Sequence, residues 1–317
     1  MHAGFLFVPQ HKSLRAGVYD SATRGGKQQP NQRPMMWPQA RERQEAAVAQ
    51  IDTLTGKTVL ITGASTGIGR ALALELASAG TQLSLNARDE DRLGQAARAC
   101  AALGAEVLAV PGDVSLPADC PRIVQRTLER FQKLDVLVNN AGMTMWARFD
   151  ALEDLGPLER LLAVNYLGAA RMTAAALPYL KNSRGLIVAV ASIAGLTGVP
   201  ERTGYAASKH AMVGFFESLR IELRGSGVDV TIVAPDFVVS ELHKGALGAD
   251  GRPLGKTPMD EPHIMTSEQC ARLIVRAMRR RTRLLITSRR GRFGRWARLL
   301  APALVDRIAE RAIRRRR

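Results

Sequence analysis

The chain has 317 residues, of which 46% are hydrophobic, so it can bury a substantial core in one large domain or two small ones. Its formal net charge of +16 is unevenly divided, because residues 271–317 hold 17 Arg against two acidic residues, whereas residues 51–270 hold 21 basic and 24 acidic residues. A nucleic-acid-binding protein usually spreads basic charge over its binding face, so this division argues against a nucleic-acid partner. The three cysteines match no metal-binding or disulfide spacing, which favours a reducing compartment and no metal site.

The first fifty residues lack hydrophobic periodicity and are rich in Gln, Pro, Arg and Gly. This composition predicts a disordered extension over residues 1–50, with room for one short helix over residues 41–49. The apolar piece at residues 5–8 is too short for a signal peptide, and no apolar run reaches the length of about eighteen residues typical of a membrane span. We therefore expect a cytoplasmic protein.

Between residues 51 and 290, short apolar runs alternate with stretches of helical periodicity. The runs that predict strands are 58–61, 82–86, 106–110, 134–138, 185–191, 228–233 and 284–288. Such alternation is typical of βαβ units, which form a parallel sheet covered by helices on both faces. The sequence therefore predicts one α/β domain with a doubly wound parallel sheet of about seven strands.

A glycine-rich turn follows the first predicted strand. Gly63, Gly67 and Gly69 have the spacing Gly-x3-Gly-x-Gly and stand between an apolar run that ends at Ile61 and a helical stretch that starts at Arg70. A turn of this kind holds a dinucleotide pyrophosphate against the helix N-terminus, where unpaired N–H groups and the helix dipole favour negative charge. The turn therefore indicates a dinucleotide site.

Further motifs follow the later strands. Asn140, Ala141 and Gly142 come after the fourth predicted strand, Ser192 after the fifth, and Tyr205 precedes Lys209 by four residues. Together, in this order and at these spacings, the motifs resemble those of the short-chain dehydrogenase/reductase family in its single-domain form, over residues 55–290. The resemblance implies a Rossmann-type fold, a homo-oligomer and an NAD(P)-dependent oxidoreductase that interconverts a carbonyl compound and an alcohol by hydride transfer.

The resemblance also implies a catalytic set of Asn165, Ser192, Tyr205 and Lys209. Tyr205 and Lys209 are four residues apart and so share one face of a helix. A tyrosine is a poor acid or base near neutral pH, and a neighbouring ammonium favours the phenolate form. We expect Tyr205 to pass a proton to or from the substrate oxygen and Ser192 to hydrogen-bond that oxygen. By resemblance, Lys209 would hold the nicotinamide ribose and Asn165 would connect it to solvent through a water molecule.

The residues after the second strand bear on the choice of cofactor. An NAD enzyme usually places an acidic residue there for the ribose hydroxyls, whereas this chain has Ala87 followed by Arg88. A guanidinium suits a phosphate, so NADP(H) is favoured over NAD(H). The resemblance departs at Asp236, which replaces a glycine. The remaining cofactor contacts that we expect are Gly63, Ser65, Thr66, Gly67, Ile68, Gly69, Asp113, Val114, Asn140, Ala141, Gly142, Tyr205, Lys209, Pro235, Val238 and Ser240.

The expected substrate contacts come from loops at the carboxyl ends of the strands. They are Ser192, Met143, Trp146 and Phe237, with Met145, Phe149, Leu196, Val199, Leu242 and His243 as further candidates. Because these residues are mostly apolar, we expect an apolar ketone or aldehyde and its alcohol, although several could simply pack the loops. The segment 245–265 resembles the mobile substrate lid of the family. The alternative is a non-catalytic dinucleotide-binding or scaffold module that uses its basic tail.

Residues 291–317 form a basic tail in which two amphipathic helices are predicted, one on each side of Pro302. Apolar Phe293, Trp296, Leu299 and Leu300 oppose Arg295 and Arg298, and Leu304, Val305, Ile308 and Ala312 oppose Asp306, Arg307, Glu310 and Arg311. Basic amphipathic helices with tryptophan bind anionic membrane surfaces. Similar extensions in hydroxysteroid-dehydrogenase-like relatives meet both membrane and dimer partner. Peripheral attachment to the inner face of a membrane and packing against protein both stay open.

Overall fold

The computed structural model describes residues 54–257, 259 and 264–314. The predicted disordered extension over residues 1–50 and the helix over residues 41–49 lie outside these residues, as do the last three arginines.

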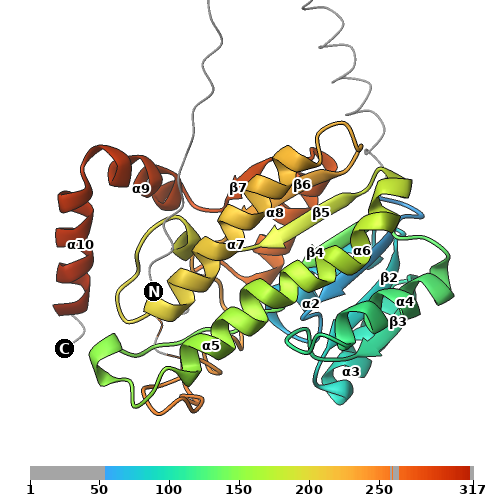
Figure 1. Ribbon diagram of the computed structural model, residues 1–317. Helices are drawn as coiled ribbons and strands as arrows, with labels where there is room; N and C mark the ends of the chain where they lie inside the picture. Colours follow the sequence, from blue (N-terminus) through green and yellow to red (C-terminus); the bar gives the residue numbers. More distant parts are fainter. Residues whose placement is uncertain (1–53, 258, 260–263, 315–317) are drawn as a thin grey trace, which may run out of the picture. The chain divides into compact units, whose positions relative to one another are not determined.

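Seven parallel strands form one sheet in the order β3-β2-β1-β4-β5-β6-β7 (Figure 1). The strands are β1 (Thr58–Thr62), β2 (Gln82–Ala87), β3 (Glu106–Pro111), β4 (Val136–Asn139), β5 (Leu186–Val190), β6 (Asp229–Ala234) and β7 (Leu284–Ile286). The chain changes direction across the sheet between β1 and β4, and doubly wound sheets bind ligands at such a switch point. The predicted fold is confirmed.

Helices pack on both faces of the sheet, so the central strands β1 and β5 are buried along their whole length. One face carries α2 (Gly67–Ala77), α3 (Glu90–Ala101) and α8 (Ser267–Arg279), and the opposite face carries α4 (Asp119–Phe131), α6 (Ala169–Ser183) and α7 (Thr203–Glu222). Figure 1 shows α6 and α7 running across the sheet. These two layers place the loops that follow the strands at one edge of the domain.

Short elements surround this edge. They are the 3-10 helices Phe149–Ala151 and Ile193–Gly195, the helix α5 (Gly156–Leu162) and a π-helical segment, Ala163–Gly168, that leads from α5 into α6. A π-helical turn inside a longer helix is frequent at functional sites, because it changes the direction of the side chains on the turn.

The last predicted strand is shorter than expected. β7 ends at Ile286 instead of Ser288, because Ser288 is the N-cap of α9 (Arg289–Leu300) and its Oγ accepts a hydrogen bond of 2.9 Å from the N–H of Gly291. The expected boundary between domain and tail at residues 290 and 291 therefore falls inside the first turn of this helix.

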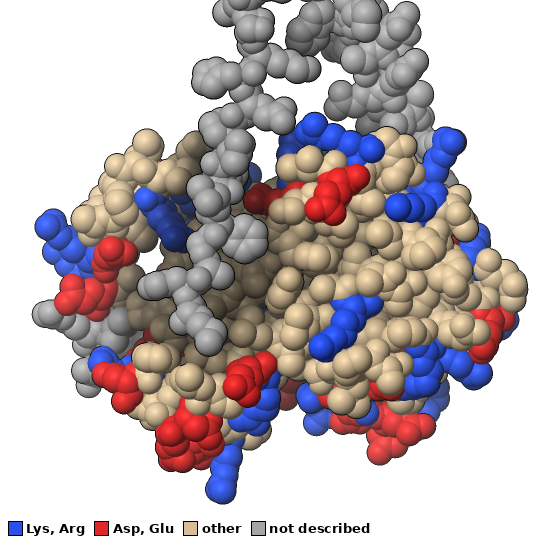
Figure 2. Space-filling model, in the orientation of Figure 1, with Lys and Arg blue, Asp and Glu red and all other residues tan. Residues whose placement is uncertain are grey.

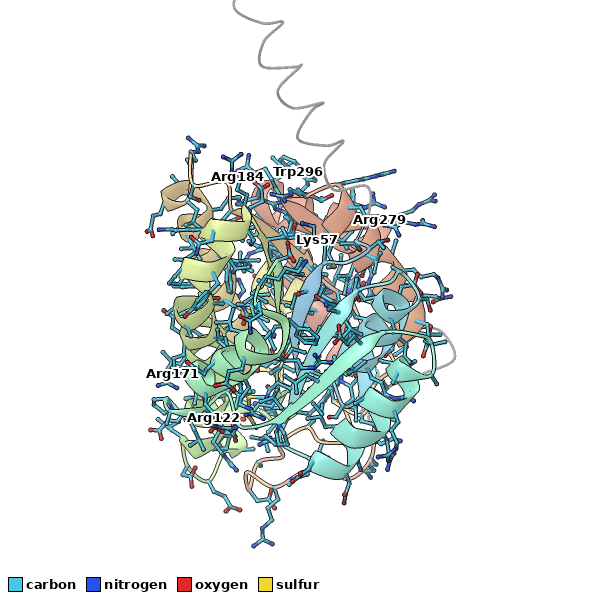
Figure 3. All side chains as sticks on the ribbon, turned by 90° about the vertical axis from the view of Figure 1, so that its right-hand side faces the viewer. Lys57, Arg122, Arg171, Arg184, Arg279 and Trp296 are labelled. Carbon is cyan, nitrogen blue, oxygen red and sulfur yellow. The ribbon has the colours of Figure 1, made fainter. Side chains whose placement is uncertain are left out.

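Two helices, α9 and α10 (Pro302–Arg314), follow the sheet as predicted and lie together at one side of the domain (Figure 1). Arg298 of α9 turns toward the domain, where its Nη1 donates to the carbonyl oxygen of Leu196 at 2.9 Å. The apolar residues of α9 face away from it, and Trp296 is 65% exposed and lies near the rim of the molecule in Figure 3. Within the described part of the chain, no helix is long and apolar enough to cross a membrane.

Candidate active site

A cleft of about 1110 Å³ lies at the carboxyl ends of the strands. Most of its walls come from the segments that follow β1, β2, β3, β4, β5 and β6, and the rest from α5, the π-helical segment and the start of α7. Every expected cofactor residue except Gly69 lines this one cleft.

The glycine-rich turn has the backbone that its spacing predicts. Gly63 and Gly67 have φ angles of +65° and +53°, a region that favours glycine, and a Cβ on Gly69 would lie 2.2 Å from the carbonyl oxygen of Gly63. Gly69 therefore closes the turn from behind instead of lining the cleft. The Asn140 side chain donates to the carbonyl oxygens of Thr62 and Gly63, which fixes the turn to the end of β4.

The first turn of α2 points its unpaired N–H groups toward the same end of the cleft, as at any helix N-terminus. Thr66 is the N-cap, and its side chain makes no capping hydrogen bond. A turn this compact beside free backbone donors fits a dinucleotide pyrophosphate.

Arg88 and Asp113 lie at the rim beyond the turn. Arg88 Nη1 is 3.8 Å from Asp113 Oδ2, and the Arg88 side chain is 72% exposed. Asp113 is oriented by Ser115, whose N–H and Oγ donate to Asp113 Oδ1 at 2.8 and 2.7 Å. Arg92, in the first turn of α3, also lines the cleft and pairs with the N-cap Asp89, Nε to Oδ2 at 3.3 Å, which the sequence analysis did not anticipate. The available signal was a second arginine four residues after Arg88, near the carboxyl end of the same strand.

Tyr205 and Lys209 lie on the same buried face of α7, and both line the cleft together with Ser192. Lys209 Nζ is 6.0 Å from the centroid of the Tyr205 ring and donates to the carbonyl oxygen of Val190 at 2.9 Å. Burial lowers the pKa of Lys209 to about 8. Ser192 Oγ accepts from the N–H of Ala194 at 3.1 Å, so its hydroxyl hydrogen stays available to a ligand.

Asn165 is fully buried in the π-helical segment and does not line the cleft. Its Nδ2 donates to Ser208 Oγ at 2.8 Å and to the carbonyl oxygen of Met143 at 3.0 Å, while its Oδ1 accepts from the Met143 N–H at 2.8 Å. Asn165 therefore fixes the loop after β4 against α7, in the layer behind Tyr205 and Lys209.

The substrate end of the cleft differs in part from the expectation. Met143, Val199, Phe237, Leu242 and His243 line it, whereas Met145, Trp146, Phe149 and Leu196 do not. Trp146 is the main difference from the expectation: its indole N–H donates to Glu201 Oε2 at 3.1 Å, and its ring lies against Arg202, which does line the cleft. Met145 is fully buried, and Phe149 is 57% exposed on the outside of the loop.

Part of the expected lid contacts the loop after β4. The N–H of Leu247 donates to the carbonyl oxygen of Thr144, and the N–H of Trp146 donates to the carbonyl oxygen of Leu247. Gly245, Leu247 and Pro253 line the cleft, while residues 258 and 260–263 of this segment lie outside the described residues. The mobility expected for the segment stays a prediction.

Arg202 is the unexpected member of the lining. It is 4% exposed, its Nη2 donates to Thr144 Oγ1 at 2.6 Å, and its Cζ lies 4.6 Å from the centroid of the Tyr205 ring. Burial lowers the pKa of Arg202. Burial, reinforced by the charge of Arg202, also lowers the pKa of the neighbouring His243 to about 4. The sequence gives no sign of a buried cation here, because Glu201-Arg202-Thr203 reads as an exposed turn.

Asp236, the departure from the family pattern, is bonded on several sides. Its Oδ2 accepts from Ser288 Oγ at 2.7 Å, and its Oδ1 accepts from the Phe237 N–H at 2.9 Å and from Arg290 Nη2 at 2.8 Å. The carboxylate thus joins the loop after β6 to the first turn of α9. Among the described residues, no three His, Cys, Asp or Glu side chains gather as a metal site would require.

The sequence model of the short chain dehydrogenases matches residues 57–248. This chain belongs to the short-chain dehydrogenase family. It is 42% identical over 239 residues to 11-beta-hydroxysteroid dehydrogenase 1A of Arabidopsis thaliana, which covers 73% of this chain and 68% of that protein. It is also 33% identical over 275 residues to the dehydrogenase/reductase SDR family protein 7-like of Dictyostelium discoideum, which covers 85% of this chain and 84% of that protein.

Solved short-chain dehydrogenase structures share the fold. A short chain dehydrogenase/reductase from Burkholderia phymatum, in complex with NAD, has a TM-score of 0.71 and 28% identity over 79% of this chain and 95% of its own. An alcohol dehydrogenase from Thermococcus sibiricus, complexed with 5-hydroxy-NADP, has a TM-score of 0.62 and 29% identity, over 73% of this chain and 94% of its own. The expectation of an oxidoreductase is confirmed by these similarities, and the alternative of a non-catalytic module gains no support from them.

Proposed function

We propose that the protein is an NADP(H)-dependent oxidoreductase that interconverts a largely apolar ketone or aldehyde and the corresponding alcohol. The observation that carries this proposal is that Tyr205, Ser192 and Lys209 line the same cleft as the glycine-rich turn. When bound, the dinucleotide supplies or accepts the hydride.

Reduction adds one hydride to the carbonyl carbon and one proton to the carbonyl oxygen. Tyr205 donates that proton from its hydroxyl, and it takes the proton back when the alcohol is oxidised. Ser192 donates a hydrogen bond to the same oxygen and so fixes its position. The ammonium of Lys209, 6.0 Å from the centroid of the Tyr205 ring, would hold the nicotinamide ribose, and Asn165 holds the loop on which the substrate rests.

The preference for NADP(H) is supported by two cations at the rim. Arg88 is mostly exposed and only loosely paired with Asp113, and Arg92, in the first turn of α3, lines the same rim, where it pairs with the exposed Asp89. A guanidinium can bind the 2′-phosphate with two parallel hydrogen bonds, and no carboxylate stands at Ala87 to bind the ribose hydroxyls instead. The 5-hydroxy-NADP named with the Thermococcus sibiricus structure is compatible with this preference.

The apolar character of the substrate is supported by the side chains at the far end of the cleft. Met143, Val199, Phe237 and Leu242 provide thioether, aliphatic and aromatic surface around Tyr205 and Ser192. Such a lining favours a hydrocarbon body over a sugar or a phosphate ester.

We further infer that a homo-oligomer forms and that the tail attaches it to the inner, anionic surface of a membrane. The apolar face of α9 and α10 is exposed: Phe293 by 75%, Leu300 by 83% and Ile308 by 57%. On the face of the domain in Figure 2, acidic and basic side chains are intermixed, and residues 51–270 hold 21 basic and 24 acidic residues. The excess of Arg in residues 271–317 is therefore the main attraction to anionic lipid.

A screen of ketones, aldehydes and secondary alcohols with NADPH, NADH and their oxidised forms tests the catalytic proposal. We expect turnover of apolar carbonyl compounds with NADPH, and turnover by the Tyr205→Phe variant that is lower by about 10²- to 10⁴-fold. Binding of both dinucleotides without turnover of any compound would contradict it.

A further inference from the structure

Within the part of the chain that the structure describes, Arg202 is a buried cation without an ionic partner. It is 4% exposed, and none of the ion pairs among the described residues includes it. A guanidinium carries five N–H groups. Among the described residues, the Nη atoms of Arg202 make one hydrogen bond, from Nη2 to Thr144 Oγ1, and its buried Nε makes none. Burying a charge in this way costs free energy unless a partner compensates it.

The aromatic rings around Arg202 compensate only part of this cost. The Cζ atom lies 4.6 Å from the ring centroid of Tyr205, 5.1 Å from that of Trp146 and 5.9 Å from that of Phe237. Contacts between a cation and aromatic faces are favourable, but they leave the N–H groups at the edge of the guanidinium plane unbonded. These edges are where a carboxylate binds.

A second polar side chain of the cleft lies near Arg202. His243 is 6% exposed, and among the described residues its Nδ1 makes no hydrogen bond of standard geometry; the nearby backbone of Val238 acts against the lowering of the His243 pKa without reversing it. Its ring packs edge-on against Phe237, with centroids 6.5 Å apart. Because burial and the Arg202 charge lower the pKa of His243 to about 4, its imidazole is neutral near pH 7 and can hydrogen-bond an oxygen without adding charge.

We propose that Arg202, assisted by His243, binds an acidic group of the substrate, so that the substrate is an apolar oxo acid and the product the corresponding hydroxy acid. This inference rests on the proposed carbonyl reduction at Tyr205. Because Arg202 stacks on the Tyr205 ring, the carboxylate and the reacting carbonyl must be only a few bonds apart in the substrate. The hydrocarbon body then occupies the surface formed by Met143, Val199 and Leu242.

Paired substrates test the proposal by activity. The probes are 2-oxo-4-phenylbutanoate, 4-oxo-4-phenylbutanoate and 5-oxo-5-phenylpentanoate, each compared with its methyl ester, with NADPH in excess. For at least one spacing we expect kcat/KM of the acid to exceed that of the ester by about 10- to 100-fold, the range of one charge-assisted contact. Arg202→Met should remove this ratio, Arg202→Lys should retain part of it, and Arg290→Met should leave it unchanged.

Arg290 is the matched control because its guanidinium also faces Phe237, at 5.8 Å, but lies outside the cleft on a side chain that is 71% exposed. Acid-to-ester ratios near one at every spacing in the wild type would overturn the proposal. So would an acid preference that survives Arg202→Met in a folded variant.

A binding measurement separates this proposal from the proposed function. Calorimetry with 4-phenylbutanoate and 4-phenylbutanamide, in the presence of NADP+, needs no turnover. We expect the acid to bind at least tenfold more tightly than the amide, and this difference to vanish in Arg202→Met. If neutral ketones are reduced but the acid is not bound selectively, the proposed function stands and the role of Arg202 is wrong. If the acid is bound selectively but no carbonyl compound is reduced, the role of Arg202 stands and the proposed function is wrong.

Discussion

Tyr205 is 5% exposed, and its ring centroid lies 4.6 Å from Arg202 Cζ and 6.0 Å from Lys209 Nζ. Its ring is therefore held by neighbours that do not depend on its hydroxyl group. Tyr205→Phe should lower kcat by about 10²- to 10⁴-fold, the range for loss of a general acid or base. The dissociation constant of NADPH, measured by fluorescence titration, should change less than about twofold. A variant with near wild-type turnover would show that another group moves the proton.

At the other end of the cleft, Arg88 should distinguish the two dinucleotides. Arg88→Ala is expected to weaken NADPH binding by about 1.5–3 kcal/mol, the range for a hydrogen bond to a charged group, because the 2′-phosphate loses its guanidinium. NADH binding should barely change. Arg92→Ala should have a smaller effect in the same direction, because Arg92 is already paired with Asp89. Equal losses for both dinucleotides, measured by calorimetry, would mean that Arg88 supports the loop instead of reading the phosphate.

His243 should make the stability of the domain depend on acid. Its pKa is lowered from 6.5 to about 4 in the folded protein by burial and by the Arg202 charge, so between these values the unfolded chain binds the proton and the folded chain does not. The free energy of unfolding should therefore fall as pH decreases from 6.5 to 4, by about 3 kcal/mol in total from this residue. Urea denaturation of His243→Gln should lack this part of the pH dependence. If the free energy of unfolding of the variant and of the wild type changes equally with pH, another group causes the acid sensitivity.

Among the elements, the loop after β6 and the helix α9 are joined by Asp236. Its carboxylate is 10% exposed and accepts hydrogen bonds from Ser288 and the Phe237 backbone. Asp236→Gly restores the residue that is usual in the family, but it should lower the free energy of unfolding by about 1–3 kcal/mol, because buried donors lose their acceptor. Arg290→Met should cost under about 1 kcal/mol, since that partner is 71% exposed. Thermal denaturation of both variants measures this difference in the free energy of unfolding. Equal losses would mean that the ion pair with Arg290, not the hydrogen bonds to Ser288 and Phe237, joins the loop to α9.

Elements with a strong local pattern could be predicted from the sequence, and positions that depend on distant neighbours could not. The apolar runs predicted all seven strands, and the glycine spacing predicted a turn whose φ angles only glycine adopts readily. Trp146 was expected among the lining residues and is not one of them; its orientation depends on Glu201, which is 55 residues away. Arg202 was missed for the same reason: its burial comes from Thr144, Trp146 and Phe237, and a charged residue before a helix is ordinarily solvated.

At the scale of the whole molecule, the open question is what covers the apolar face of α9 and α10. Arg298 ties α9 to the domain through Leu196, so the helix is oriented with its Arg298 side inward and Phe293, Trp296 and Leu300 outward. A monomer seldom leaves a continuous apolar surface exposed unless it meets a membrane or another protein. The nine arginines of residues 291–317 favour an anionic membrane, since each basic residue near such a surface contributes about 1 kcal/mol.

The triple variant Phe293→Ser, Trp296→Ser, Leu300→Ser should therefore lose binding to vesicles of phosphatidylcholine and phosphatidylglycerol without losing thermal stability, because all three side chains are mostly exposed. Co-sedimentation at low and high salt measures the electrostatic and the apolar contributions to binding. Salt should weaken binding of the wild type by screening its arginines, whereas the variant should bind weakly at either salt concentration. Leu103→Ser, an exposed apolar residue beyond the end of α3, is the control and should bind as the wild type does. If the wild type ignores the vesicles and the triple variant changes from dimer to monomer in sedimentation velocity, the two helices pack against a second subunit and the membrane proposal is wrong.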